Sequence, residues 1–245
     1  MRDDLKTDLL QVALVQFDIV WKKALVNLDR IYKLIENVDA DLIVLPEMFG
    51  TGFIDDPHQT ELHDKQCLEW MKQLSLTKNA AVTGSLAVEV DGKYYNRMYF
   101  VTPDEKVIYY DKKHLFALGD EAKVFESGNV PVLASFKGWT FSLSICYDLR
   151  FPAWARYNAP YDVFLCVANW PAPRVNAWDS LLCARAIENQ CYAIGVNRIG
   201  DDPKVKGYPG HSVTFTPMGE SMGMKEGECV LVHTLFQNEL QGVRK

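Results

Sequence analysis

The chain opens with two apolar runs of buried-strand type, Val12-Ala13-Leu14-Val15-Gln16-Phe17 and Leu42-Ile43-Val44-Leu45. Between them, residues 21–37 carry apolar side chains at the 3.6-residue period of an amphipathic helix. A second helix is predicted over residues 61–78. This strand–helix–strand–helix order favours a parallel or mixed sheet covered by helices.

The middle of the chain predicts hairpins instead. Strand-like runs at 81–90 and 93–102 flank Asp91-Gly92, and runs at 132–136 and 139–145 flank Lys137-Gly138. Further elements are a strand at 107–110, a strand at 163–168, a helix at 178–189, and strands at 191–197, 211–216 and 229–233. About eleven strands with four or five helices predict an α/β fold, with two sheets packed face to face and helices outside, in one domain spanning 1–245.

Composition narrows the function classes. Of 245 residues, 48% are hydrophobic and 24% charged, which excludes a disordered chain, a collagen and a coiled coil. The net charge of −6, without a Lys/Arg block, argues against a nucleic-acid partner. No apolar run approaches the ~20 residues of a membrane span, and the polar start has no signal-peptide pattern, so we expect a cytoplasmic protein. Its six cysteines include no CxxC pair and are expected to be free thiols.

Reactive polar residues follow three of the predicted strands. Glu47 follows the strand at 42–45, Lys113 follows the strand at 107–110, and Cys146 closes the apolar run at 141–145. Strand ends and the loops after them are where α/β scaffolds collect catalytic groups. A nucleophilic thiol needs a nearby base or cation, and Lys113 is our candidate cation, with Lys112 interpreted as facing solvent. Individually, each residue also fits a structural role, as a turn acid, a surface lysine or a core thiol.

Together the three motifs are more specific. The order Glu, Lys, Cys in the contexts Leu-Pro-Glu-Met-Phe, Asp-Lys-Lys-His-Leu-Phe and Ile-Cys-Tyr-Asp-Leu-Arg-Phe-Pro resembles the carbon–nitrogen hydrolase (nitrilase) superfamily. The resemblance runs from about Val12 to His233, and Asn169-Trp170-Pro171 and the helix at 184–189 agree with it. Tyr147-Asp148 after the cysteine, where true nitrilases have Trp-Glu, is similar to the omega-amidase branch.

The resemblance implies a four-layer α-β-β-α sandwich with two mixed sheets, a homodimer, and no cofactor. It also implies roles for the site residues. Cys146 would attack an amide carbonyl, and Lys113 with the Tyr147 N–H would hold the oxyanion. Glu47 would carry protons, and Glu121 would be the family's second, supporting glutamate. Asn169 and Trp170 would line the substrate site.

The expected reaction is hydrolysis of a small anionic omega-amide, of the 2-oxoglutaramate or 2-oxosuccinamate type, to the acid and ammonia through a cysteine thioester. Arg150 is the candidate for the substrate carboxylate, because Arg binds carboxylates bidentately; a structural ion pair is the alternative. Two other functions stay open: a ureido-acid or carbamoyl-amide hydrolase, and a catalytically silent binding protein. No metal site is expected, since His58 and His63 lack a ligand-type scaffold.

Overall fold

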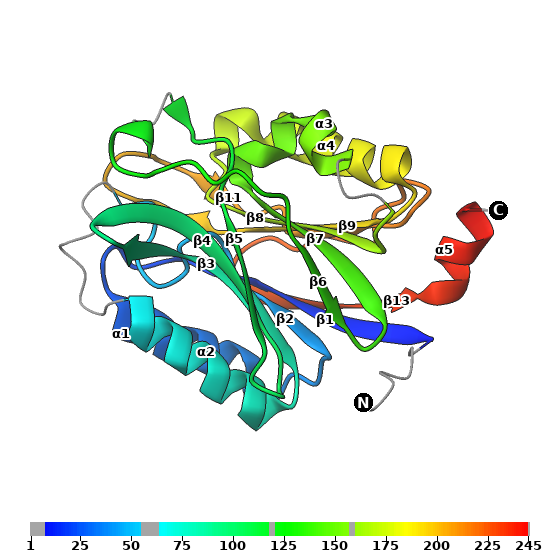
Figure 1. Ribbon diagram of the computed structural model, residues 1–245, viewed down its shortest axis with the longest axis horizontal. Coiled ribbons are helices and arrows are strands. Elements are labelled where there is room, and N and C mark those ends of the chain that lie inside the picture. Colours follow the sequence, from blue (N-terminus) through cyan, green and yellow to red (C-terminus); the bar gives the residue numbers. More distant parts are fainter. Residues whose placement is uncertain (1–7, 55–63, 118–120, 157–159, 245) are drawn as a thin grey trace.

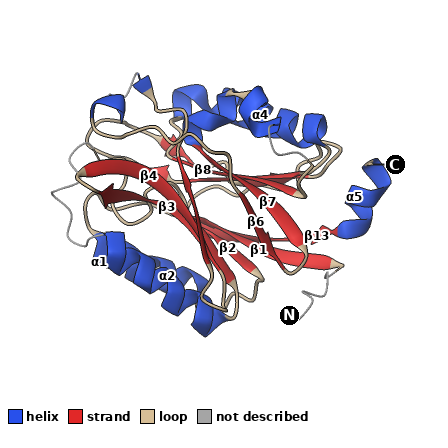
Figure 2. Cartoon of the chain, viewed as in Figure 1, coloured by secondary structure: helices blue, strands red, loops and turns tan. Residues whose placement is uncertain are grey.

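The computed structural model describes residues 8–54, 64–117, 121–156 and 160–244. Two sheets stack face to face, with helices on the outer face of each (Figures 1 and 2). This arrangement confirms the predicted four-layer α-β-β-α sandwich.

The first sheet has six strands in the order β13-β1-β2-β3-β4-β5. Its central strands β1, β2 and β3 are parallel, and the remaining pairs are antiparallel, so the sheet is mixed as expected. Two helices, α1 (Ala24–Ile35) and α2 (Asp64–Lys78), cover its outer face (Figure 1). The strands are β1 (Leu9–Gln16), β2 (Leu42–Val44), β3 (Ala81–Val90), β4 (Lys93–Val101), β5 (Val107–Asp111) and β13 (Cys229–Phe236).

The second sheet has five strands in the order β12-β9-β8-β7-β6, and β7, β8 and β9 are parallel. Helix α4 (Val175–Asn189) packs against it so closely that a Cβ on Gly195 would lie 2.3 Å from Leu182 Cδ1. The strands are β6 (Leu133–Phe136), β7 (Trp139–Ile145), β8 (Val163–Ala168), β9 (Tyr192–Asn197) and β12 (Val213–Phe215). The remaining elements are α3 (Pro152–Arg156), α5 (Gln237–Val243), β10 (Ile199–Gly200), β11 (Tyr208–Pro209), and the 3-10 helices η2 (Glu121–Lys123), η3 (Cys146–Arg150) and η4 (Ala172–Arg174).

Apolar side chains fill three layers of the sandwich. On β1, Leu10, Val12 and Leu14 face the second sheet, whereas Ala13 and Val15 face α1 and α2. Because both faces of the strand are buried, its sequence is apolar at successive positions and shows no alternation. The third layer joins the second sheet to α4 and contains Trp178, which is fully buried.

Most predicted elements are present, with shifted ends. The two hairpins and the strands at 139–145 and 163–168 are confirmed. The helix expected from residue 178 begins earlier, at Val175, and residues 61–63 of the expected second helix lie outside the described residues. The prediction did not include β10 and β11, because two-residue strands leave no periodic pattern.

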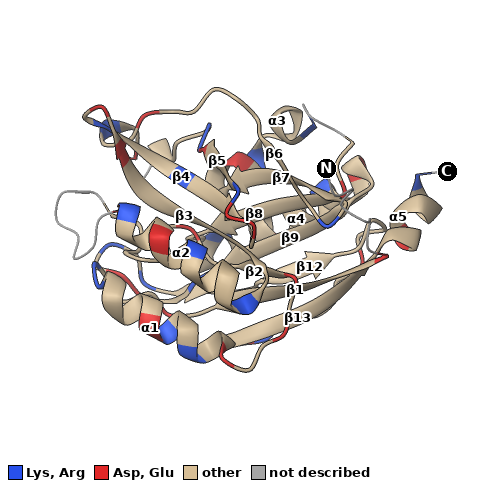
Figure 3. Cartoon of the chain, turned by 60° about the horizontal axis from the view of Figure 1, so that its bottom comes forward, with Lys and Arg blue, Asp and Glu red and all other residues tan. Residues whose placement is uncertain are grey.

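Charges of both signs are interspersed on the outer helices α1 and α2 (Figure 3), where Lys33 pairs with Asp29 and Lys72 with Glu69. None of the helices in the described part of the chain is both long and apolar enough to cross a bilayer.

One buried carboxylate ties the two sheets together. Asp148, in η3, is 1% exposed and accepts a hydrogen bond from the Tyr110 hydroxyl of β5 at 2.8 Å. Its other oxygen accepts the backbone N–H of His114 at 2.8 Å and lies 2.8 Å from His114 Nδ1. The Ile145 N–H, at the end of β7, also donates to Asp148. The loop after β5 and the turn after β7 are thereby fixed to each other.

We expect Asp148→Asn to lower the free energy of unfolding by about 2 to 4 kcal/mol, because the amide leaves buried donors without an acceptor. Chemical denaturation measures the change. Asp29→Asn is the control, since Asp29 forms an exposed i,i+4 pair on α1 and its loss should cost less than about 0.5 kcal/mol. Equal losses of stability in the two variants would contradict the role of Asp148 in joining the two sheets.

Candidate active site

Polar side chains from both sheets meet at one end of the sandwich. The first sheet supplies Glu47, shortly after β2, and Lys112, directly after β5; the second supplies Cys146 after β7 and Asn169 after β8. These four residues line one cavity. As expected, the ends of buried strands carry the site.

A buried ion cluster forms the floor of the site. The Lys112 ammonium donates to Glu47 Oε1 at 2.9 Å, and to both carboxylate oxygens of Glu121 at 3.0 and 2.9 Å. The side chains of Lys112 and Glu47 are fully buried. Glu121 also accepts the Phe116 N–H at 2.6 Å, which holds the loop after β5 against η2. The structure therefore brings Glu47 and Glu121 together, around Lys112.

The assignment of Lys113 as the site cation is wrong, and so is the solvent-facing position expected for Lys112. Lys112 is 0% exposed, whereas Lys113 does not line the cavity and its ammonium lies 5.8 Å from the centre of the Trp154 ring. The reason is strand parity. Ile108 and Tyr110 of β5 face the space between the sheets, and alternation places residue 112 on the same side. Continuing the period of two beyond the strand would have identified Lys112.

Two asparagines hold the Glu47 carboxylate. Asn96, on β4, donates its amide to Glu47 Oε1 at 2.8 Å and to Glu121 Oε1 at 3.1 Å. Asn169 donates its backbone N–H to Glu47 Oε2 at 2.8 Å, and its side-chain amide to the Glu47 carbonyl at 2.9 Å. Asn96 was not predicted as a site residue, because its only signal in the sequence is a polar residue inside a strand. Asn169, predicted to lie at the substrate site, lines the cavity and also donates to the neighbouring Glu47 carboxylate.

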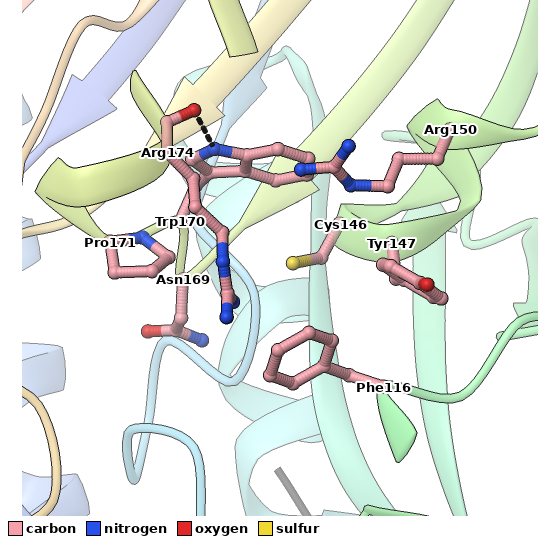
Figure 4. A pocket seen from close by; sticks show the side chains of 8 residues that line it. All are labelled: Phe116, Cys146, Tyr147, Arg150, Asn169, Trp170, Pro171 and Arg174. Atoms are coloured by element: carbon pink, nitrogen blue, oxygen red, sulfur yellow. Dashed lines mark hydrogen bonds between the residues drawn. The ribbon is translucent and has the colours of Figure 1, made fainter. Parts of the chain in front are cut away.

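Cys146 occupies a sharp turn between β7 and η3. Its φ is +47°, in the left-handed region that side chains rarely adopt, and such a position costs of order 1 kcal/mol or more. Figure 4 shows its sulfur pointing into the cavity between Phe116 and Arg174. Burial and the negative charge of Glu47 raise the pKa of the Cys146 thiol well above its ordinary value, against the opposing effect of Lys112. The resting thiol is therefore protonated at neutral pH.

Lys112 stays charged. Burial disfavours the ammonium, but Glu121 and Glu47 outweigh burial and raise the pKa of Lys112 well above its ordinary value. The site thus holds a permanent cation, two carboxylates and a neutral thiol.

Aromatic and basic side chains line the cavity around Cys146 (Figure 4). The Arg150 guanidinium lies 5.1 Å from the centre of the Trp170 ring, and the Arg174 guanidinium lies 4.9 Å from the centre of the Phe116 ring. Neither arginine forms a salt bridge with a carboxylate among the described residues, so the structural ion pair considered for Arg150 is absent there. Arg174 and Phe116 were not predicted as site residues, because neither stands directly at a strand end.

Tyr147 lies beside the nucleophile, and its ring contacts the rings of Phe116 and Phe151 edge-on. The other cysteines are free, and Cys67, Cys166 and Cys191 are buried. His58 and His63, set aside as metal ligands, lie outside the described residues.

Comparisons with known proteins agree with this geometry. The Carbon-nitrogen hydrolase family model matches residues 11–245. The omega-amidase YafV of Escherichia coli K12 is 41% identical over 86% of this chain and 83% of its own, and the 2-oxoglutaramate amidase of Bacillus subtilis is 36% identical over 88% and 87%. The crystal structure of XC1258 from Xanthomonas campestris, described as a CN-hydrolase superfamily protein with an arsenic adduct in the active site, has a TM-score of 0.93 at 34% identity. It covers 97% of this chain and 94% of that one.

These matches span most of the chain, and they confirm the resemblance that the three separated motifs carry. The chain therefore belongs to the carbon–nitrogen hydrolase family and is a hydrolase of carbon–nitrogen bonds other than peptide bonds.

Proposed function

We propose that this protein is a thiol-dependent amidase that converts a small anionic omega-amide, of the 2-oxoglutaramate or 2-oxosuccinamate type, to the carboxylic acid and ammonia. The observation that carries the proposal is the position of Cys146, on a strained turn beside the buried cluster of Glu47, Lys112 and Glu121. The names of the amidase relatives support the same substrate class. The proposal includes a homodimer, a cytoplasmic location and independence of metals.

In the first half-reaction, Glu47 removes the thiol proton as the Cys146 sulfur attacks the amide carbonyl carbon. The negative charge that develops on the carbonyl oxygen is held by the Lys112 ammonium and the Tyr147 N–H. Fixed donors at such an oxygen are worth a few kcal/mol of transition-state stabilisation. Glu47 then gives its proton to the amide nitrogen, and the carbon–nitrogen bond breaks. Ammonia departs, and the acyl group remains on Cys146 as a thioester.

In the second half-reaction, Glu47 deprotonates a water molecule that attacks the thioester carbonyl. The same two donors hold the oxyanion, the carbon–sulfur bond breaks, and the sulfur recovers the proton from Glu47. A positioned acid–base of this kind contributes typically 10²–10⁴-fold in rate. Glu121 contacts Lys112 and Asn96, and acts by positioning them.

Arg150 is our candidate for the substrate carboxylate. Its guanidinium lines the cavity beside Cys146 and has no carboxylate partner in the described part of the chain. Stacking on Trp170 holds the planar group while its N–H edges remain able to donate. An anionic acyl group would therefore be oriented with its amide at the thiol.

Product analysis tests the proposal. We expect stoichiometric ammonia and dicarboxylic acid from 2-oxoglutaramate, without carbon dioxide, and an acyl adduct on Cys146 in acid-quenched protein by mass spectrometry. Cys146→Ala should lose turnover and adduct together, whereas Cys183→Ala should keep both. Release of carbon dioxide with ammonia from a ureido acid would favour the carbamoyl-amide alternative. A protein that releases ammonia from neither class would be the catalytically silent alternative.

Replacing the two neighbouring lysines tests the corrected assignment. Lys112→Ala should lower kcat at least about 10³-fold, since it removes the cation at the developing oxyanion. Thermal melts must accompany the kinetics, because two buried carboxylates lose their partner. Lys113→Ala is the matched control and should keep kcat within about threefold, since Lys113 lies outside the cavity. Equal losses in the two variants would contradict the assignment.

Glu47→Gln should separate turnover from thiol ionisation. The Glu47 charge raises the pKa of Cys146, so its removal should lower that pKa while abolishing proton transfer. Ultraviolet thiolate absorbance, titrated against pH, measures the pKa; steady-state kinetics measure kcat. An unchanged or higher thiol pKa in the variant would show that Glu47 does not act on the sulfur electrostatically.

A further inference from the structure

The cavity has two arms that meet at the nucleophile. One arm continues past Tyr147, Arg150 and Trp170, and the other past Glu47 and Asp202. Arg174 lines both arms, as does Cys146, whereas Arg150 lines only the first. In Figure 4 the Arg174 guanidinium lies beside the Cys146 thiol, and the Arg150 guanidinium lies on the other side of the thiol.

Arg174 is held in this position from two directions. Its carbonyl accepts the Trp170 indole N–H at 2.7 Å, which fixes its backbone to the wall of the first arm. Its guanidinium stacks on the Phe116 ring, and the Phe116 N–H is bound to Glu121. Within the described residues it has no carboxylate partner, so an oriented, half-buried cation faces the cavity.

From this geometry we infer that Arg174 selects the substituent next to the substrate carboxylate, favouring a 2-oxo acid amide over its 2-amino counterpart. The inference rests on the proposed function. One carboxylate is enough for the Arg150 guanidinium, so a second guanidinium needs a second acceptor. A 2-oxo oxygen supplies one, and a 2-ammonium group at the same place would be repelled by Arg174.

The carboxylates that line the arm with Arg174 already have partners of their own. The arm that Arg174 shares with the thiol is also lined by Glu47 and Asp202. The Asp202 carboxylate accepts hydrogen bonds from the backbone N–H groups of Lys204 and Val205 and from the Tyr208 hydroxyl. Lys112 pairs with Glu47, and these donors hold Asp202, so neither carboxylate pairs with Arg174, whose guanidinium remains able to donate to a neutral 2-oxo oxygen.

Ligand binding in a Cys146→Ala background tests the inference without turnover. The probes are 2-oxoglutarate, glutarate and L-glutamate, which share both carboxylates and differ only at the second carbon. Titration calorimetry should give affinities that fall in that order. Arg174→Met should reduce the preference for 2-oxoglutarate over L-glutamate by about 30-fold or more. The variant loses the charge-assisted hydrogen bond to the 2-oxo oxygen and also loses the repulsion of the 2-ammonium group.

Arg150→Met should weaken all three probes by similar factors, since it removes the shared carboxylate contact. Arg156→Met, on the outer helix α3, is the control and should change no affinity. Arg174→Lys keeps the charge and should retain part of the preference, and melts of every variant confirm folding.

The inference is overturned if Arg174→Met leaves the preference intact or weakens the three probes equally. Ammonia release from 2-oxoglutaramate by the unmodified protein is scored separately. If no ammonia were released, the proposed function would be wrong. A preference for 2-oxoglutarate that depends on Arg174 would in that case still support the role of Arg174 in ligand binding.

Discussion

The site depends on one buried ammonium placed between two buried carboxylates. Lys112 bridges Glu47 and Glu121, and all three are buried or nearly so. Moving these charges out of water costs several kcal/mol each, and the cost is offset only when every charge has partners. The partners come from separate elements: Asn96 from β4, the Asn169 N–H from the end of β8, and the Phe116 N–H from the loop after β5. The cluster therefore forms only when both sheets are in register, which couples correct folding to the assembled site.

The same cluster explains why a reactive cysteine can rest unreacted. With two carboxylates against one ammonium, the local field opposes a thiolate, and burial opposes it further. The proposed reaction begins with a neutral pair, the thiol and the substrate carbonyl, beside an acid–base that is already placed. Negative charge then moves from Glu47 through sulfur to the carbonyl oxygen, toward the Lys112 ammonium. Donors fixed in advance stabilise that movement without reorganising at the moment of reaction.

The strands that carry the site are recognisable in the amino-acid sequence, but the side that each residue faces is not. Glu47 and Cys146 were identifiable because each stands within a few residues of the end of a buried, apolar strand. Lys112 and Lys113 are adjacent, so the choice between them depended on whether the alternation of side chains continues past the end of β5. The turn after β5 hides that continuation in the sequence. Asn96 and Arg174 were beyond a local pattern, because their roles come from contacts across the sheet and across the cavity. Such contacts are set by tertiary packing, and one sequence carries no signal of them.

Chemistry and recognition are supplied by different parts of this fold. The cluster of Glu47, Lys112 and Glu121 is built from strand ends and a 3-10 turn that sit under the cavity, and substitution there leaves a buried charge unpaired. Arg150 and Arg174 stand on aromatic rings at the wall, and neither donates to the cluster. A change at the wall can therefore alter which acyl group is accepted while the cluster stays satisfied. The proposed chemistry needs only that a carbonyl lies at the thiol. The fold can therefore change its substrate by substitution of the cavity-lining residues, while the cluster of Glu47, Lys112 and Glu121 stays the same.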